Sequence, residues 1–246
     1  MVASISLVIP AYNAEAHIAS VIDRIPNPVW RRLRTLWIIN DGSSDKTAAV
    51  IESLAKRHKS IHPLYFSRNR GYGATVGTGL RLCRDDGCDF AACLHADGQY
   101  PPEAIPGFVK AMASQGISLM QGSRIASGTA LSGGMPCYKY IAGRLMTALE
   151  NLCFGLRMTD YHSGFLVYDR ACLQALPLHR MSRSFDFDLE AIASARSLGL
   201  PIGELPIPTR YADEVSYLNP IRYGFRVLWV LAKYKMGYYK ELLKRL

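Results

Sequence analysis

The chain has 246 residues, of which 49% are hydrophobic and 20% are charged, and its formal net charge at pH 7 is +9. This length is enough for one large domain with a sizeable core, and the composition is that of an ordinary globular protein. The sequence has no nucleic-acid-binding motif, no basic leader, no apolar stretch of membrane-spanning length and no C-x-x-C pair. We therefore expect a cytoplasmic protein with reduced thiols that does not bind nucleic acid.

The first half of the chain alternates apolar runs of strand length with segments of helical periodicity. Such alternation predicts an α/β fold, in which a mostly parallel central sheet has helices on both faces. The predicted strands cover residues 5–9, 36–39, 64–66, 90–94 and 118–122, and the predicted helices cover 18–25, 45–55, 74–83 and 102–114.

The second half, after residue 130, is less regular. We expect it to cover the open edge of the sheet and to bind a second substrate. Because no linker separates the halves, we predict a single domain over residues 1–216, followed by a C-terminal segment over 217–246. The predicted helices cover 138–153, 186–198 and 220–243, and strands are predicted near 165–168 and 202–207.

The C-terminal segment mixes cations with aromatic residues in "RYGFRVLWVLAKYKMGYYK". This pattern predicts one or two basic amphipathic helices. Two interpretations stay open: the segment lies on a membrane surface, or it packs on its own domain and presents a basic face to solvent.

Polar residues follow four of the predicted strands. In parallel sheets, ligands bind outside the carboxyl ends of the strands, so these clusters predict a ligand site at one edge. The sequence lacks G-x-G-x-x-G, the P-loop and the G-x-S-x-G elbow, which excludes a dehydrogenase, a P-loop ATPase and a serine hydrolase of the usual kind. The clusters are Tyr12-Asn13, Asn40-Asp41, Arg68-Asn69 and His95-Asp97-Gln99.

The stretch "LHADGQYPPE" places three polar residues at alternate positions after a buried strand. In an extended chain His95, Asp97 and Gln99 point to one side. An imidazole, a carboxylate and an amide oxygen on one side can hold a metal ion, or they can form an ordinary strand end that turns into solvent.

Eight motifs together resemble the family 2 glycosyltransferases with the GT-A fold. "SLVIPAYNAE", "IINDGSSDKT", "RNRGYGATVGTGL" and "LHADGQYPPE" occur in the order and spacing of that family. "GSR", "TDYHSGF", "FDFDLE" and "ELPIPTRY" are similar to the branch that makes dolichyl-phosphate or other polyprenyl-phosphate sugars. The resemblance covers roughly residues 4–215. It implies an enzyme that transfers a hexose from a UDP- or GDP-sugar with inversion and a divalent metal.

The resemblance implies a nucleotide-sugar half over about 1–125 and an acceptor half over about 126–216. Asp41 would accept a hydrogen bond from the base, although an aspartate there also fits an Asx-turn that starts a helix. Glycines after the third strand would let the backbone approach the donor. The implied donor-binding residues are Pro10, Tyr12, Glu15, Asp41, Arg68, Asn69, Gly73, Ala96 and Asp97.

The implied metal ligands are Asp97 and Gln99, whose oxygens suit Mn²⁺ or Mg²⁺. The sequence departs from the common D-x-D pattern because His95 replaces the first acid. His95 then either coordinates the metal, which would favour Mn²⁺, or orients the site through a hydrogen bond.

A phosphate monoester acceptor is already a dianion at neutral pH and needs cations rather than a strong base. By resemblance, Ser123, Arg124 and Arg210 would bind that phosphate, and Asp160 would position the acceptor or act as the base. The implied catalytic residues are Asp97, Asp160 and Arg124. Carboxylates at a helix start can be catalytic or simply stabilise the helix, and they are Asp186, Asp188 and Glu190.

Three functions follow from these residues. The first is hexose transfer to a polyprenyl phosphate, such as dolichyl or undecaprenyl phosphate, by an enzyme peripheral to the cytoplasmic face of a membrane. The second is the same transfer to a hydroxyl group of a glycan, glycolipid or small metabolite. The third is a non-catalytic protein that binds nucleotide sugars, in which the missing first acid marks lost chemistry.

Overall fold

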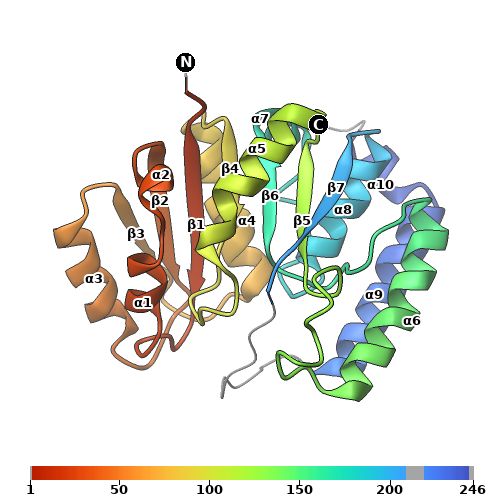
Figure 1. Ribbon diagram of the computed structural model, residues 1–246, viewed down its shortest axis with the longest axis horizontal. Coiled ribbons are helices and arrows are strands. Elements are labelled where there is room, and N and C mark those ends of the chain that lie inside the picture. The colour runs from red at the N-terminus through yellow and green to blue at the C-terminus, as the bar shows by residue number, and fades with distance from the viewer. Residues whose placement is uncertain (1, 209–218, 244–246) are drawn as a thin grey trace.

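A computed structural model describes residues 2–208 and 219–243 of the chain (Figure 1). Within these ranges seven strands form one sheet in the order β3-β2-β1-β4-β6-β5-β7. Neighbouring strands are parallel except where β6 pairs with β4 and β5. The strands are β1 (Ile5–Ala11), β2 (Leu33–Asn40), β3 (Ile61–Tyr65), β4 (Phe90–Cys93), β5 (Leu119–Ser123), β6 (Leu166–Asp169) and β7 (Ile202–Pro206). The mostly parallel α/β sheet predicted from the sequence is confirmed.

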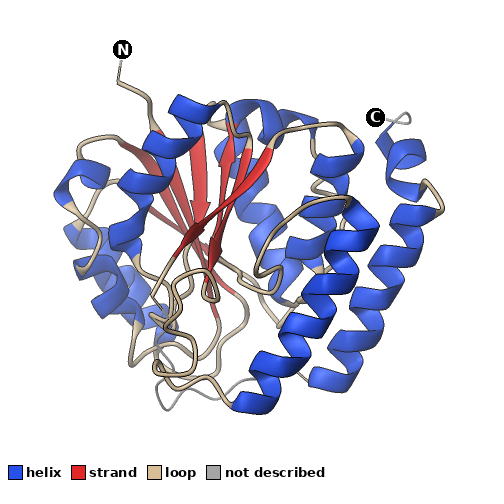
Figure 2. Ribbon diagram, turned by 45° about the vertical axis from the view of Figure 1, so that its right-hand side comes forward, coloured by secondary structure: helices blue, strands red, loops and turns tan. Residues whose placement is uncertain are grey.

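Helices cover both faces of this sheet (Figure 2). Successive residues of β1 point to opposite faces, so Leu7 enters the core beneath α1, α3 and α5, whereas Val8 enters the core beneath α4, α7 and α8. The helices are α1 (Ile18–Asp23), α2 (Asn27–Trp30), α3 (Thr47–Arg57), α4 (Tyr72–Asp85), α5 (Ile105–Gln115), α6 (Cys137–Phe154), α7 (Arg170–Ala175), α8 (Phe187–Ser197), α9 (Pro220–Lys235) and α10 (Tyr238–Leu243), with a 3₁₀ turn over Pro102–Ala104.

The helical segment predicted over residues 220–243 forms two helices, α9 and α10, within the one or two amphipathic helices that the sequence predicted. Gly237 between α9 and α10 has a φ of 75°. This left-handed conformation ends a helix and is readily adopted by glycine. The sequence also gave no indication of the short helices α2 and α7, or of the antiparallel direction of β6.

Helices α6 and α9 lie side by side at one end of the molecule and run in the same direction (Figures 1 and 2). The inner face of α9 buries Val227, Val230 and Leu231 in the core shared with α8. The C-terminal helices therefore pack on their own domain, as one of the two interpretations expected. Among the described residues, no helix combines the length and the apolar character that a membrane span requires.

Candidate functional site

The loops that follow β1, β2, β3 and β4 meet at one edge of the sheet, at the lower side of Figure 1. These four strands are neighbours and all run in parallel. Their carboxyl ends therefore bring together the four polar clusters found in the sequence. Within the predicted donor-binding set, Pro10 ends up in β1 and Ala96 is buried, whereas Tyr12, Arg68 and Asn69 are exposed.

The loops after β1 and β2 are joined by hydrogen bonds between side chains and backbone. The Asn13 Oδ1 atom accepts a hydrogen bond from the Ser44 N–H at 2.9 Å, and Glu15 Oε2 accepts one from the Lys46 N–H at 2.7 Å. Asn13 adopts a left-handed conformation with a φ of 48°, which asparagine tolerates better than most residues. Glu15 therefore fixes the entry to α3 beside the predicted base pocket.

Asp41 organises the glycine-rich turn that precedes α4. Its Oδ1 atom accepts a hydrogen bond from the Arg70 N–H at 2.7 Å, and its Oδ2 atom accepts one from the Gly71 N–H at 3.0 Å. The local turn expected of Asp41 is made instead by Asn40, whose Oδ1 accepts from the Ser43 N–H at 2.9 Å. Contact between Asp41 and a base stays a prediction.

The glycines of this turn allow a close approach to the chain's own backbone. A Cβ atom at Gly71 would collide with the carbonyl oxygen of Arg183, and one at Gly73 would collide with that of Ser182. Gly71 also has a φ of 95°, which side chains rarely permit. The turn is thereby locked onto the segment before α8, and any contact of Gly73 with the donor remains a prediction.

The end of β4 carries the predicted metal ligands. The Asp97 Oδ1 atom accepts a hydrogen bond from the Gln99 N–H at 3.0 Å, and both side chains are half-buried. The His95 Nε2 atom lies 3.1 Å from the Tyr72 hydroxyl, which donates to Asp188 Oδ2 at 2.8 Å. When Tyr72 donates its proton to Asp188, His95 completes the chain in the tautomer that carries a proton on Nε2. This geometry fits the orienting role that was one alternative for His95.

The predicted metal ligands, one carboxylate and one amide oxygen, are a small set of hard donors. The described residues contain no group of three or more His, Cys, Asp or Glu side chains placed to hold a metal ion. Such a set fits Mg²⁺ or Mn²⁺, which take few protein ligands when substrate phosphates and waters supply the rest.

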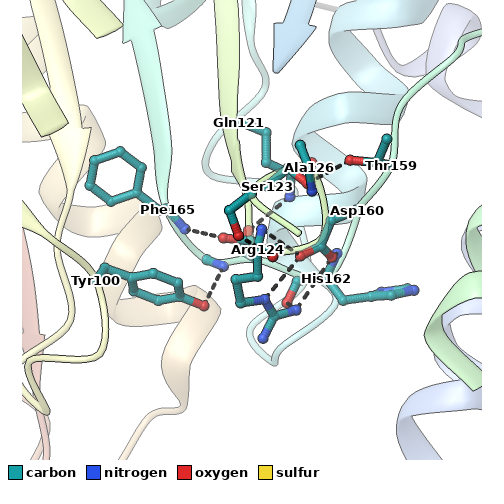
Figure 3. Close-up of polar contacts among 12 residues, drawn as sticks. Tyr100, Gln121, Ser123, Arg124, Ala126, Thr159, Asp160, His162 and Phe165 are labelled. Atoms are coloured by element: carbon teal, nitrogen blue, oxygen red, sulfur yellow. Dashed lines mark hydrogen bonds and ion pairs between the residues drawn. The ribbon is translucent and has the colours of Figure 1, made fainter. Parts of the chain in front are cut away.

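A buried ion pair joins Arg124, which follows β5, to Asp160 (Figure 3). The Arg124 Nε atom donates to Asp160 Oδ2 at 2.9 Å, and Nη2 donates to Asp160 Oδ1 at 3.3 Å. The Asp160 side chain is only 4% exposed. Burial alone would raise the pKa of Asp160, but the Arg124 guanidinium and the hydrogen bonds outweigh it, so the pKa lies below its usual value. Asp160 is therefore ionised at neutral pH.

Of the other two predicted phosphate ligands, the structure describes Ser123 but not Arg210. The Ser123 hydroxyl is buried, lies 2.6 Å from the Thr159 Oγ1 atom and accepts a hydrogen bond from the Ala126 N–H at 2.9 Å. Ser123 thus ties β5 to the segment that carries Asp160. Arg210 lies outside the described residues, so its role stays a prediction.

Sequence reasoning missed a cluster of His162, Glu150 and Tyr223 beside this ion pair. The His162 carbonyl accepts a hydrogen bond from Arg124 Nη2 at 3.0 Å, and Nδ1 of its ring lies 3.1 Å from the Tyr223 hydroxyl of α9. The ring's Nε2 atom faces Glu150 Oε2 of α6 at 3.4 Å. Burial raises the pKa of Glu150 to about 9 and lowers the pKa of His162 to about 4, so both are neutral at pH 7. The histidine within "TDYHSGF" was the available clue.

The three carboxylates at the start of α8 separate into different environments. Asp186 forms an ion pair with Arg226 at 3.1 Å, and Glu190 forms one with Lys233, both cations belonging to α9. Asp188 instead faces the site through its bond with Tyr72, and burial raises its pKa to about 7. The acidic motif therefore does not form one cluster.

Three comparisons place the chain among known proteins. Residues 6–176 match the family model described as "Glycosyl transferase family 2". The chain is 27% identical over 246 residues to UDP-N-acetylglucosamine--dolichyl-phosphate N-acetylglucosaminyltransferase of Methanococcus voltae, covering 95% of this chain and 96% of that protein. It is 27% identical over 203 residues to undecaprenyl-phosphate mannosyltransferase of Micrococcus luteus, covering 81% of each.

The fold is similar to that of solved glycosyltransferases. Glucosyl-3-phosphoglycerate synthase from Mycobacterium tuberculosis, crystallised with Mn²⁺, uridine diphosphate and phosphoglyceric acid, superposes with a TM-score of 0.65 at 21% identity. The match covers 94% of this chain and 77% of that chain.

Proposed function

Because the chain belongs to glycosyl transferase family 2 and has the GT-A fold that its motifs predicted, we propose that this glycosyltransferase moves a hexose from a nucleoside-diphosphate sugar to a polyprenyl phosphate. The curated relatives named above support the acceptor, since their names specify dolichyl or undecaprenyl phosphate. The reaction would then take place at a membrane surface, on which the lipid acceptor resides.

Asp97 and Gln99 would hold the divalent metal, Mn²⁺ or Mg²⁺, beside the donor diphosphate. When bound, the metal neutralises negative charge that develops on the departing diphosphate. Tyr72 and Asp188 hold His95 in one orientation through the chain of hydrogen bonds described above, and His95 keeps this strand end in place. The four loops at the carboxyl edge bind the nucleotide.

The observation that carries the acceptor proposal is the buried ion pair of Arg124 with Asp160. The pKa of Asp160 is held below its usual value, and burial lowers the pKa of His162 to about 4. Both groups are therefore weak bases. A phosphate dianion attacks without losing a proton, so it needs Arg124 for binding and no strong base.

Transfer to a hydroxyl group is the second candidate, and one observation favours it. Burial raises the pKa of Asp188 to about 7, which is the range suited to a general base at neutral pH. Against it, Asp188 is 7% exposed and its Oδ2 atom already accepts the Tyr72 proton.

The testing experiment measures nucleoside diphosphate release from a panel of UDP- and GDP-sugars with Mn²⁺, with and without a short-chain polyprenyl phosphate. Release that requires the lipid phosphate is the expected result. Release that requires a hydroxyl compound instead would move the acceptor to the second candidate. Tight donor binding without turnover under any condition would favour a non-catalytic nucleotide-sugar-binding protein.

Asp97→Asn supplies the matched variant for this experiment. We expect turnover to fall by a factor on the order of 10²–10³, since the variant lacks the carboxylate that would hold the metal. Folding should be unchanged, because an amide oxygen can still accept the hydrogen bond from the Gln99 N–H. Full turnover by Asp97→Asn would contradict the metal assignment.

A further inference from the structure

Helices α6 and α9 expose a row of large apolar side chains that the proposed chemistry does not use. Their exposed fractions run from 38% at Leu149 to 78% at Leu152. Contiguous exposed apolar surface on a globular protein marks a site of interaction. We name this surface the α6–α9 face, and its members are Tyr138, Ile141, Leu145, Leu149 and Leu152 of α6 with Ile221, Phe225, Leu228 and Trp229 of α9.

The apolar residues of each helix recur every three or four positions, which places them on one stripe. On α6 this stripe lies opposite Thr147 and Phe154, which are buried, and on α9 it lies opposite Val227 and Val230. The exposed apolar stripe of each helix is therefore on the side that the protein does not cover. A solvated basic face, expected if α9 simply packed on the domain, would not carry an exposed Phe225 at 70%.

The two stripes form one surface. A Cβ atom at Gly224 of α9 would lie 3.9 Å from Met146 of α6, so the helices touch at these positions. Successive residues of a helix are rotated by about 100° around its axis. Met146 therefore lies roughly a quarter turn from the exposed stripe of α6, and Gly224 lies roughly a quarter turn from that of α9. Seen along the chain direction, these two rotations are opposite. Because the helices run in the same direction (Figure 2), both stripes face the same side.

The charged side chains that α6 and α9 themselves expose have one sign. The only acid in the sequences of α6 and α9 is Glu150, which is fully buried and neutral at pH 7. Arg144 of α6 and Arg222 and Lys235 of α9 are exposed beside the apolar stripes. Apolar residues flanked by cations, with no exposed acid within α6 or α9, fit the headgroup region of a membrane that contains anionic lipids.

We propose that the α6–α9 face docks on the headgroup region of an anionic lipid bilayer. The proposal rests on the function proposed above, in which the acceptor is a membrane lipid. Both helices also border the acceptor site: the ring of His162 lies 3.4 Å from Glu150 of α6 and 3.1 Å from the Tyr223 hydroxyl of α9, and the His162 carbonyl accepts a hydrogen bond from Arg124. The helices that carry the docking face are therefore also the helices that border the site of Arg124.

The test measures sedimentation of the full chain with vesicles of phosphatidylcholine, with and without phosphatidylglycerol. The variant is the double substitution Leu145→Glu and Phe225→Glu, which adds two charges to the face. The control is Leu198→Glu, at an apolar residue that is 37% exposed and lies just after α8. Transfer to a short-chain, water-soluble polyprenyl phosphate is measured in parallel without vesicles, and circular dichroism checks the fold.

We expect the parent and Leu198→Glu to bind vesicles more tightly when phosphatidylglycerol is present. The double variant should lose at least about tenfold in partitioning, because its face is no longer apolar. It should keep vesicle-free transfer within about threefold of the parent, since neither substituted residue contacts the proposed site.

Three results would overturn the docking proposal: a parent that does not bind anionic vesicles, a double variant that binds as well as the parent, or a parent that dimerises through this face. Sedimentation equilibrium detects the last, because the double variant would then be monomeric where the parent is a dimer. If vesicles bind as expected but no variant transfers sugar to the soluble lipid phosphate, the docking surface stands and the proposed acceptor fails.

Discussion

The donor edge and the acceptor half hold their carboxylates in different ways. At the donor edge, Glu15 and Asp41 accept hydrogen bonds from backbone N–H groups of neighbouring loops. In the acceptor half, Asp160 is buried and its main partner is the guanidinium of Arg124. Backbone donors are neutral and fixed by the fold, whereas a side-chain cation can be removed by one substitution. The acceptor half is therefore the more fragile part of the site.

The same contrast extends to the helices that cover the acceptor half. Glu190 in α8 accepts hydrogen bonds from Lys233 in α9 and from the Tyr239 hydroxyl in α10, the latter at 2.9 Å. Its side chain is 4% exposed. Electrostatic pairs of this kind connect the C-terminal helices to the domain, in addition to the apolar core between α8 and α9. Sequence changes in α9 can therefore reach the acceptor site.

Arg124→Gln is expected to have the largest effect. It leaves the buried carboxylate of Asp160 without its cation, which we expect to cost about 3–5 kcal/mol of unfolding free energy at pH 7 and to abolish transfer. The loss should shrink as the pH falls below the usual pKa of aspartate, because a protonated Asp160 has no ion pair to lose. Chemical denaturation over a series of pH values measures both effects.

A matched control for that experiment is Arg84→Gln. Arg84 pairs with Asp85 at 3.0 Å, and their side chains are 31% and 63% exposed. An exposed pair contributes at most about 1 kcal/mol. If Arg124→Gln and Arg84→Gln were equally stable, Asp160 would not be held as a buried anion. The contrast between the donor edge and the acceptor half would then lose its main support.

The donor edge could be predicted from the sequence because its residues directly follow parallel strands. Parallel strands end at one edge, so Asp41 after β2 and Asp97 after β4 had to lie at the same edge of the sheet. The acceptor half has no such rule, since Arg124 and Asp160 are 36 positions apart and meet only through the antiparallel β6 and its preceding loop.

The acidic motif at α8 shows the same limit. Asp186 and Glu190 are four positions apart and share a side, on which both accept hydrogen bonds from Ser182 and pair with cations of α9. Asp188 lies two positions from each and contacts Tyr72 instead, although the sequence predicted the three as one group. Their partners lie on α4 and α9, and the order in which helices pack around the sheet was not visible in the local pattern.

Glu150→Gln is expected to have an intermediate effect, in the stabilising direction. Glu150 has a pKa of about 9 in the folded chain, whereas in the unfolded chain it releases its proton near pH 4–5. The free energy of unfolding therefore falls as the pH rises from about 5 to about 9. The variant lacks this titration. Between pH 6.5 and 8.5, we expect its stability relative to the parent to rise by about 1–3 kcal/mol.

That pH range also isolates Glu150 from its neighbour. Burial lowers the pKa of His162 to about 4, so this ring loses stability only as the pH falls below the ordinary pKa of histidine. Above that value it is neutral in both the folded and the unfolded chain. A relative stability of Glu150→Gln that does not change with pH would mean that Glu150 is ionised and paired with a charged His162.

The smallest effect is expected at Glu15, on the donor edge. Glu15→Ala removes the acceptor of the Lys46 N–H, and we expect a cost of about 0.5–1 kcal/mol, because water can reach the exposed N–H group in its place. Glu15→Gln keeps an acceptor oxygen and should stay within about 0.5 kcal/mol of the parent. Denaturation midpoints of the two variants, measured beside Arg124→Gln, compare the regions directly. If Glu15→Ala lowered the free energy of unfolding as much as Arg124→Gln does, the hydrogen bonds at the donor edge would stabilise the protein as much as the buried ion pair. The acceptor half would then not be the more easily destabilised region.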